Sequence, residues 1–326
     1  MYQVKRVLQV LGYAVAALIA AAVLLWMGAT LRYYDFFANA HSEFMIPGLS
    51  SNWVPQGFEY LPEQDIYLMS GHMSDGTASR IYLRQGSGKT SYVNLQNSDG
   101  TPYVGRADGI CYNGEYLYIA GGDRVNVFRL SDVLNRTDAK QIGSIPVGYE
   151  LAYCSFYNGH LLAGNFYRED THETPSSHRL NTPTGDDNKA LITVFKADGQ
   201  AQFGVDPVPV GAISTRGLVQ GICFTDDGDV LLSTSYGISV SQLERHRIDT
   251  SKRANIQTAG AGVPLIYLDS STLVETVTTP PMAEELIFKD GRVLILNQSA
   301  CNQYIFGKFT RGYQVYSCVL ASEVSD

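Results

Sequence analysis

The chain has 326 residues, of which 45% are hydrophobic, so it is long enough to bury a large core. Its formal net charge of -8 argues against a protein that reads nucleic acid, because such proteins carry a basic face. The 31 Gly and 21 Tyr are typical of a chain built from strands and tight turns.

The first expected element is a membrane-spanning helix over residues 7–31, a stretch without a charged residue. Lys5 and Arg6 come just before it, which predicts a short cytoplasmic tail (1–6) and export of everything beyond the helix. A cleaved signal peptide is the alternative, but the apolar stretch is long for one. We expect a single-pass protein of the cell membrane, with a juxtamembrane stalk of irregular structure over 32–52 and one extracytoplasmic domain over 53–326.

A short motif recurs five times in this domain: an acidic or amide residue and a small residue precede alternating apolar residues that end on an aromatic. The closing aromatics are 44 to 68 residues apart: Tyr60, Tyr112, Phe156, Phe224 and Phe288. After most copies comes an Asx-Gly pair and a second apolar run, which is a strong β-hairpin signal. Repeats of this length with several short strands predict an all-β fold, a β-propeller. Five copies favour five blades, and six is the alternative because the two longest intervals could contain another blade.

Two irregular stretches interrupt the expected blades. A polar insertion over 168–189 divides the third blade, and a second excursion over 249–262 precedes two strands of the fourth, at 264–268 and 273–278. The ring must be closed either by the last strand, 313–320, or by the stretch before the first blade.

In a propeller, the start of each innermost strand and the end of the second strand meet at one face, around the central channel. Polar residues occupy these positions, and we expect them to form a ligand site at this mouth: Gln56, His72, Asp108, Glu150, Asn165, Gln220, Tyr236, Glu284 and Asn297. The insertion, with His172 and His178, would fold over the same side. The alternative is that these side chains only bond to neighbouring blades, as buried polar groups must.

Three carboxylates belong to this set. Asp108, Glu150 and Glu284 could hold a hard cation such as calcium, or the mouth could take a cationic or sugar-like ligand.

The five Cys have a separate interpretation in an exported domain. Cys301 and Cys318 are expected on neighbouring outer strands of the last blade, where a disulfide is plausible, and two separate buried thiols are the alternative. Cys111 and Cys223 hold the same position in equivalent strands and are expected to be packing residues.

Several short motifs resemble known propellers. One group resembles the plant-type glutaminyl cyclases, which are five-bladed propellers: Gln56-Gly57, Ser70-Gly71, Ser79-Arg80-Ile81, and Glu150-Leu151 leading to Gly159 and Asn165. A second group is similar to uncharacterised exported bacterial propeller proteins: Val219-Gln220-Gly221, Ser233-Thr234-Ser235-Tyr236-Gly237, Met282-Ala283-Glu284-Glu285, Asn297-Gln298-Ser299-Ala300-Cys301 and Tyr304. The resemblance covers residues 53–320 and implies the fold.

The cyclase reaction is not implied by this resemblance. The strand Tyr67-Leu68-Met69-Ser70 lacks the acidic residue of the cyclase pattern, and Tyr149-Glu150-Leu151-Ala152 replaces its Asn-Glu-Leu-Glu motif. The pocket Trp residues are also missing, since the sequence has only Trp26 and Trp53.

The favoured hypothesis is therefore a membrane-anchored extracytoplasmic propeller that binds a small polar or cationic ligand, or a component of the cell envelope, at an acidic channel mouth. One alternative is an enzyme on the same face, a metal-dependent hydrolase or lactonase or a cyclase relative, with His72 as general base. Another is a scaffold that works through its blade edges.

Overall fold

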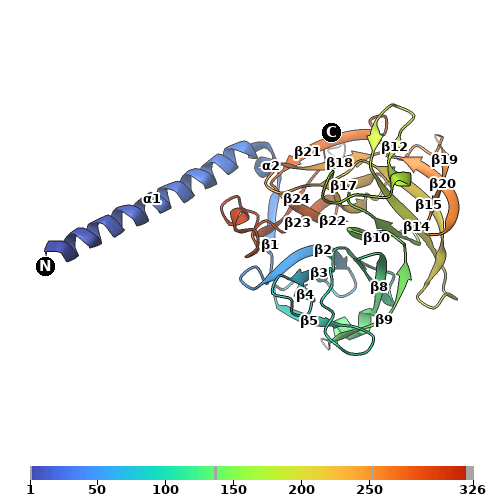
Figure 1. The fold of residues 1–326 in the computed structure, drawn as a ribbon, viewed down its shortest axis with the longest axis horizontal. Coiled ribbons are helices and arrows are strands. Elements are labelled where there is room, and N and C mark those ends of the chain that lie inside the picture. Colours follow the sequence, from blue (N-terminus) through green and yellow to red (C-terminus); the bar gives the residue numbers. More distant parts are fainter. Residues whose placement is uncertain (1, 136–137, 252, 321–326) are drawn as a thin grey trace.

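The computed structural model describes residues 2–135, 138–251 and 253–320 (Figure 1). Met1 of the predicted tail and residues 321–326 of the predicted domain lie outside these ranges. The helix α1 (Tyr2–Arg32) extends away from a body of strands, and α2 (Tyr34–Asn39) joins it to them. By length and composition α1 can cross a membrane: residues Gln3–Arg32 have a mean hydropathy of 2.4 in their most apolar window, and that window is not buried against the protein.

Among the described residues, 20 of the 24 strands fall into five units of four, each ordered from an inner to an outer strand, and outer strands of some units pair to give larger sheets. Unit one contains β2 (Trp53–Leu61), β3 (Ile66–Met73), β4 (Arg80–Gln85) and β5 (Thr90–Gln96). Unit two contains β6 (Ile110–Tyr112), β7 (Tyr116–Gly121), β8 (Arg124–Arg129) and β9 (Ala139–Pro146), with α3 (Leu130–Leu134) after β8. Unit three contains β10 (Tyr153–Tyr157), β11 (His160–Gly164), β14 (Ala190–Ala197) and β15 (Val205–Thr215).

Unit four contains β16 (Val219–Phe224), β17 (Val230–Thr234), β18 (Ser241–His246) and β21 (Leu273–Thr279). Unit five contains β22 (Ala283–Lys289), β23 (Arg292–Asn297), β24 (Gln314–Cys318) and β1 (His41–Met45). The inner strands contact one another in the order β2, β6, β10, β16, β22 and back to β2, so they close a ring. The prediction of a β-propeller preceded by one apolar N-terminal helix is confirmed.

The small residue of the repeated motif lies where inner strands approach each other. A Cβ atom on Gly57 would come within 2.8 Å of the backbone nitrogen of Ile110, and one on Gly109 within 2.3 Å of that of Cys154. In the same way, a Cβ atom on Gly221 would meet the Cα atom of Glu285 at 2.7 Å. Glycine is therefore required at these positions because the ring narrows toward its axis.

The hydrophobic core is distributed between neighbouring units. One cluster joins Phe58 and Met69 of unit one to Leu296 and Val315 of unit five, and comparable clusters join the other neighbours. Each sheet buries both faces, and the alternation of apolar residues along the strands fits this packing.

The ring is closed by a strand that precedes the first unit. β1 pairs with β24 in antiparallel register, with His41 opposite Ser317 and Met45 opposite Gln314. The irregular structure expected over 32–52 is therefore wrong for much of this stretch, which supplies α2 and the outermost strand of unit five. An edge strand of five residues has no second apolar run or Asx-Gly turn to reveal it.

The excursion between β18 and β21 also differs from the prediction. It forms a hairpin of β19 (Ala254–Thr258) and β20 (Ala261–Tyr267), and β20 pairs in parallel with β15 of unit three. The strand expected at 264–268 therefore extends the neighbouring unit rather than unit four. In the other insertion, η1 (Ser176–His178) precedes a short hairpin of β12 (Leu180–Asn181) and β13 (Asp187–Asn188).

Candidate functional site

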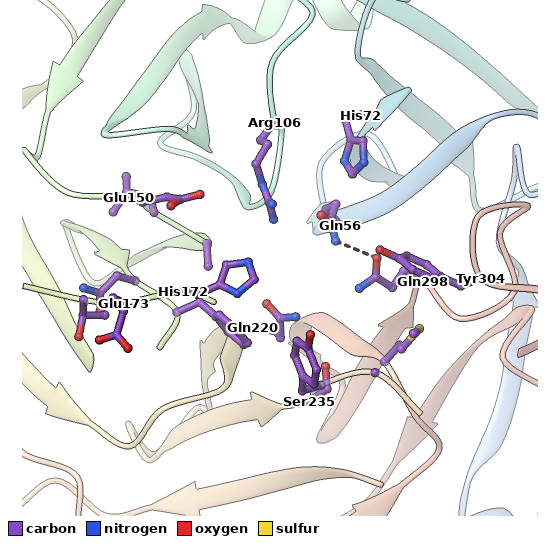
Figure 2. A pocket seen from close by; sticks show the side chains of 18 of the residues that line it. Gln56, His72, Arg106, Glu150, His172, Glu173, Gln220, Ser235, Gln298 and Tyr304 are labelled. Atoms are coloured by element: carbon purple, nitrogen blue, oxygen red, sulfur yellow. Dashed lines mark hydrogen bonds between the residues drawn. The ribbon is translucent and has the colours of Figure 1, made fainter. Parts of the chain in front are cut away.

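A cavity of about 300 Å³ opens at the end of the channel where the inner strands begin (Figure 2). We call it the mouth pocket. Every unit contributes side chains to its wall, and the insertion after β11 covers part of it. Its principal polar lining residues are Gln56, His72, Arg106, Glu150, Asn165, His172, Glu173, Gln220, Ser235, Tyr236, Gln298, Gln303 and Tyr304.

Most of the residues predicted from the repeat positions meet here. Six of them line the mouth pocket: Gln56, His72, Glu150, Asn165, Gln220 and Tyr236. The other three, Asp108, Glu284 and Asn297, are buried and are not part of its wall. The propeller geometry thus brings positions far apart in the sequence to one end of the channel.

Glu284 lies beneath the pocket and is held by amides. The Nε2 atom of Gln56 donates a hydrogen bond to one carboxylate oxygen at 3.0 Å, and the Nε2 atoms of Gln298 and Gln220 donate to the other. Burial nevertheless raises the pKa of Glu284 well above its usual value, and the nearby charge of Asp108 adds to this shift. The amides therefore orient a carboxyl group whose protonated form is favoured by burial.

Asp108 is paired with an arginine that the repeat does not mark. The Nε atom of Arg106 donates to Asp108 Oδ2 at 2.6 Å, while the Arg106 side chain is half exposed at the pocket. Burial raises the pKa of Asp108 to about 6, although the guanidinium favours the charged form. The mouth is less acidic than predicted because this cation lies among its carboxylates.

The predicted cation site is not assembled. Within the described ranges no group of three or more His, Cys, Asp or Glu side chains is placed to hold a metal ion. Asp108 accepts a hydrogen bond from Arg106, and Glu284 accepts hydrogen bonds from three amides, so both carboxylates already have protein partners. A calcium cage of Asp108, Glu150 and Glu284 therefore does not fit this arrangement.

Two buried polar atoms at the pocket have no partner in the part of the chain that the structure describes. They are Nδ1 of His72 and Oγ of Ser235. Ser235 is only 3% exposed. Burial lowers the pKa of His72 to about 4, with the charge of Arg106 as a second cause, so this imidazole is neutral at pH 7. Buried polar groups are normally satisfied, so each atom retains hydrogen-bonding capacity for an ordered water or a bound molecule.

The insertion forms one wall of the pocket through aromatic and charged contacts. Arg168 donates to the Tyr236 hydroxyl at 2.9 Å and its guanidinium lies 3.8 Å from the centre of the Tyr236 ring. The ring of Phe166 packs edge-on against His172, at 5.3 Å between centres. The predicted placement of His172 over the mouth therefore holds, whereas His178 is not among the lining residues.

Asn165 lines the pocket and also connects neighbouring segments of the chain through hydrogen bonds. Its Oδ1 atom accepts the N–H of Leu191 at 2.8 Å, and its Nδ2 atom lies 2.9 Å from Nδ1 of His178. The side chain thus ties β11 to the insertion and to the strand that follows it. For this residue the structural interpretation accounts for both polar ends.

Sequence reasoning missed five polar lining residues: Arg106, Ser235, Gln298, Gln303 and Tyr304. Arg106 lies two residues before the marked Asp108, Ser235 follows the end of β17, and the last three follow the end of β23 in a loop. Loop residues fall outside the repeat, so no periodic signal marks them. Proximity to a marked strand end is the one signal that could have identified Arg106 and Gln298.

All five cysteines are buried free thiols, so Cys301 and Cys318 follow the alternative of two separate thiols and do not form the candidate disulfide. Cys318 pairs across from Val293 near the beginning of β23, whereas Cys301 lies in the loop beyond the end of that strand. The two thiols are therefore separated by the length of the strand. The thiols of Cys111 and Cys154, in adjacent inner strands, lie 3.6 Å apart.

Comparison with known proteins gives a likeness of fold. No protein-family model and no curated protein matches the sequence. A putative oxidoreductase (glucose dehydrogenase) from Thermus thermophilus is 12% identical with a TM-score of 0.44, over 86% of this chain and 99% of that one. The PQQ-bound form of an aldose sugar dehydrogenase from Streptomyces coelicolor is 12% identical with a TM-score of 0.45, over 85% and 96%.

A chain of a nidogen/laminin complex is also similar, at 9% identity and a TM-score of 0.40, over 76% of this chain and 73% of that chain. Likeness at these levels concerns the fold alone. Nothing in these findings links the chain to the glutaminyl cyclases, and that resemblance stays one of short motifs.

Proposed function

We propose that this protein is a membrane-anchored, extracytoplasmic propeller whose mouth pocket binds a small, neutral, polar ligand of the sugar or polyol class. One observation carries the proposal: a polar cavity of about 300 Å³ collects side chains from all units and contains buried polar atoms of His72 and Ser235 without a partner among the described residues. A ligand rich in hydroxyl groups can both donate to and accept from such atoms.

The charges at the pocket favour a neutral ligand over a cation. Arg106 lies among the carboxylates and is paired with Asp108, and Glu173 is paired with Arg179. His72 is uncharged at neutral pH, since the pKa of its imidazole is lowered to about 4. A cationic ligand would meet the half-exposed guanidinium of Arg106, and a bare metal ion would lack a converging set of ligands among the described residues.

The size and chemistry of the wall also suit a sugar. The cavity lies at the lower end of the range of small-molecule sites, which matches a monosaccharide rather than a longer chain. The side chains of Gln56, Gln220 and Gln298 add amide groups to the wall, and the ring of Tyr236 lines it with Arg168 packed on its face. A saccharide of the cell envelope has the size and the hydroxyl groups that this cavity suits, and an exported propeller would encounter it. The hydrolase alternative needs the metal cage that is not assembled from the described residues.

The anchor is supported by the way α1 ends. Its apolar residues are exposed along most of its length, but Ala29 and the following Tyr33 are buried against the propeller in one cluster with Tyr316. The last turn of α1 therefore belongs to the folded body, which favours a retained anchor over a cleaved signal peptide. Lys5 and Arg6 favour a cytoplasmic N-terminus.

The test measures thermal stabilisation of the full chain in detergent by a panel of hexoses, pentoses and hexitols, with choline and calcium chloride as cationic probes. A ligand at about a hundred times its dissociation constant adds close to 3 kcal/mol of stability, which shifts the melting temperature by several degrees. We expect a shift with at least one neutral probe and none with the cations. A shift with calcium alone would contradict the proposal.

A matched pair of variants then locates the ligand. Ser235→Ala removes a hydroxyl that has no partner among the described residues, so the fold should be retained while the ligand-induced shift is reduced. Thr279→Val removes another buried hydroxyl without such a partner that does not line the mouth pocket, and it should leave the shift unchanged. Equal loss of the shift in both variants would place the ligand elsewhere.

A further inference from the structure

A loop with exposed apolar side chains lies beside the junction of α1 and the propeller. It runs from Cys301 to Gly312 between β23 and β24 and contains η2 (Ile305–Lys308). Ile305, Phe306 and Phe309 are 50%, 65% and 36% exposed. Large apolar side chains gathered in one exposed loop usually mark a surface that contacts a partner or a membrane.

The conformation of this loop is fixed by its own backbone. The N–H of Gly307 donates to the carbonyl of Ser299 at 2.7 Å, and that of Gly312 donates to the carbonyl of Gly307 at 2.8 Å. A Cβ atom on Gly307 would meet the backbone of Ser299 at 2.1 Å, so the turn requires glycine. The apolar side chains are therefore presented outward by a folded loop.

The loop also contacts the segment that follows α1. The guanidinium carbon of Arg311 lies 4.3 Å from the centre of the Phe37 ring in α2. On its other side, Nδ2 of Asn302 donates to the carbonyl of Ser50 at 3.1 Å. In Figure 1 this dark red loop, next to β1, lies on the side of the propeller from which α1 extends. A bilayer crossed by α1 would therefore face the loop.

We infer that the loop from Cys301 to Gly312 is a second membrane contact, seated in the interfacial layer of the bilayer that α1 spans. This inference rests on the membrane anchoring proposed above. The side chains of Ile305, Phe306 and Phe309 enter the boundary between headgroups and acyl chains. Lys308 belongs to the same loop, and its ammonium group donates a hydrogen bond to Oδ1 of Asn302 at 2.8 Å.

The contact bears on the proposed ligand because the same loop reaches the mouth pocket. Gln303 and Tyr304 line the pocket, and Ile305 and Phe306 follow directly in the chain. The membrane contact would thus hold the mouth pocket next to the lipid surface. The pocket would bind its ligand there.

The experiment uses the full chain in vesicles of phosphatidylcholine and phosphatidylglycerol. A polarity-sensitive fluorophore is attached to a cysteine introduced by Phe306→Cys, and quenching by nitroxide-labelled lipids is measured. The native cysteines are all buried, and the unsubstituted chain gives the background of labelling. Val208→Cys is the control on β15 of unit three, because Val208 is an apolar residue of similar exposure, 56%. Tyr13→Cys in the middle of α1 reports whether the helix enters the bilayer.

We expect lipid-borne nitroxides to cause a loss of fluorescence at positions 13 and 306 and no loss at position 208. Quenching at 13 with none at 306 would overturn the membrane contact while leaving the anchor intact. Absence of quenching at both would overturn the anchor and this inference with it. Equal quenching at 306 and 208 would also overturn it, since the loop would then be no closer to lipid than the rest of the propeller.

Discussion

Glu285 shows how a single buried residue makes the stability of this propeller depend on pH. Its carboxyl group is 2% exposed, and one of its oxygens has no partner among the described residues. It lies farther along the inner strands than the mouth pocket, at a second cavity of about 160 Å³ that also includes Glu59 and Cys154. Burial, with smaller contributions from these two neighbours, raises the pKa of Glu285 well above its usual 4.5.

The sign of the effect follows from proton binding. Above pH 4.5 the unfolded chain loses this proton while the folded chain keeps it, so the free energy of unfolding falls as pH rises toward the elevated pKa. The decrease is about 1.4 kcal/mol for each pH unit in this window. We expect Glu285→Gln to remove this part of the pH dependence, so that its stability relative to the parent chain is greater at about pH 7 than at about pH 5.

Denaturant unfolding of the full chain in detergent at the two pH values checks this. Glu63→Gln is the control, because it changes an exposed carboxylate in the loop between β2 and β3 and should alter stability little at either pH. An unchanged pH dependence in Glu285→Gln would show that the buried carboxyl does not retain its proton.

At the scale of elements, the closing strand β1 buries the side chain of Phe44 and leaves its other four residues exposed. Its ring lies 4.8 Å from the ring of Tyr67, centre to centre, and 4.1 Å from the guanidinium carbon of Arg84, both in unit one. β1 pairs with β24 of unit five, so Phe44 joins the last unit to the first. We expect Phe44→Ala to lower the free energy of unfolding by about 3 kcal/mol.

The next residue offers a matched control for that variant. Met45 is 66% exposed on the same strand, and Met45→Ala should change stability by less than about 0.5 kcal/mol. Thermal and denaturant unfolding of both variants would compare them. Equal effects would mean that the strand contributes through its backbone pairing and that the Phe44 ring is not a closure contact.

These elements also show what the sequence could predict. The repeated motif predicted the inner hairpins because two physical requirements shape it. Neighbouring inner strands approach closely at Gly57 and Gly109, and alternate apolar residues of each strand are buried. β1 could not be found in this way, since an outer strand follows no common pattern and its partner β24 lies at the other end of the chain. The parallel pairing of β20 with β15 is likewise set by tertiary packing, and no local sequence pattern predicts it.

The candidate site likewise has residues that the repeat marks and residues that only tertiary contacts determine. Strand-end residues such as Gln56 and Gln220 were predictable because the ring places equivalent positions together. The pairing of Arg106 with Asp108 was not predictable from the repeat, and it places a guanidinium group among the carboxylates of the mouth. Whether carboxylates converge depends on side-chain partners, which the repeat does not specify.

At the scale of the whole molecule, the structure joins the apolar helix α1 to the propeller through α2. Phe36 of α2 is 4% exposed, and its ring lies 5.7 Å from that of Tyr316 in β24. Phe37 packs on the same tyrosine at 5.5 Å. A helix of six residues is not stable by itself in water, so these contacts keep α2 folded. The propeller should therefore hold a fixed orientation relative to α1.

Hydrogen exchange of the full chain in vesicles tests this rigid junction. The amides of α2 should exchange slowly in the parent chain, and Phe36→Ala should speed their exchange about a hundredfold, since loss of about 3 kcal/mol of packing corresponds to two factors of ten. The amides of β2 should be unaffected in the same sample. Tyr34→Ala, at a position of the same helix that is 62% exposed, should leave exchange in α2 nearly unchanged. If the α2 amides of the parent chain already exchange as fast as an unfolded peptide, the junction is a flexible tether, and a fixed placement of the Cys301–Gly312 loop against the membrane would lose its support.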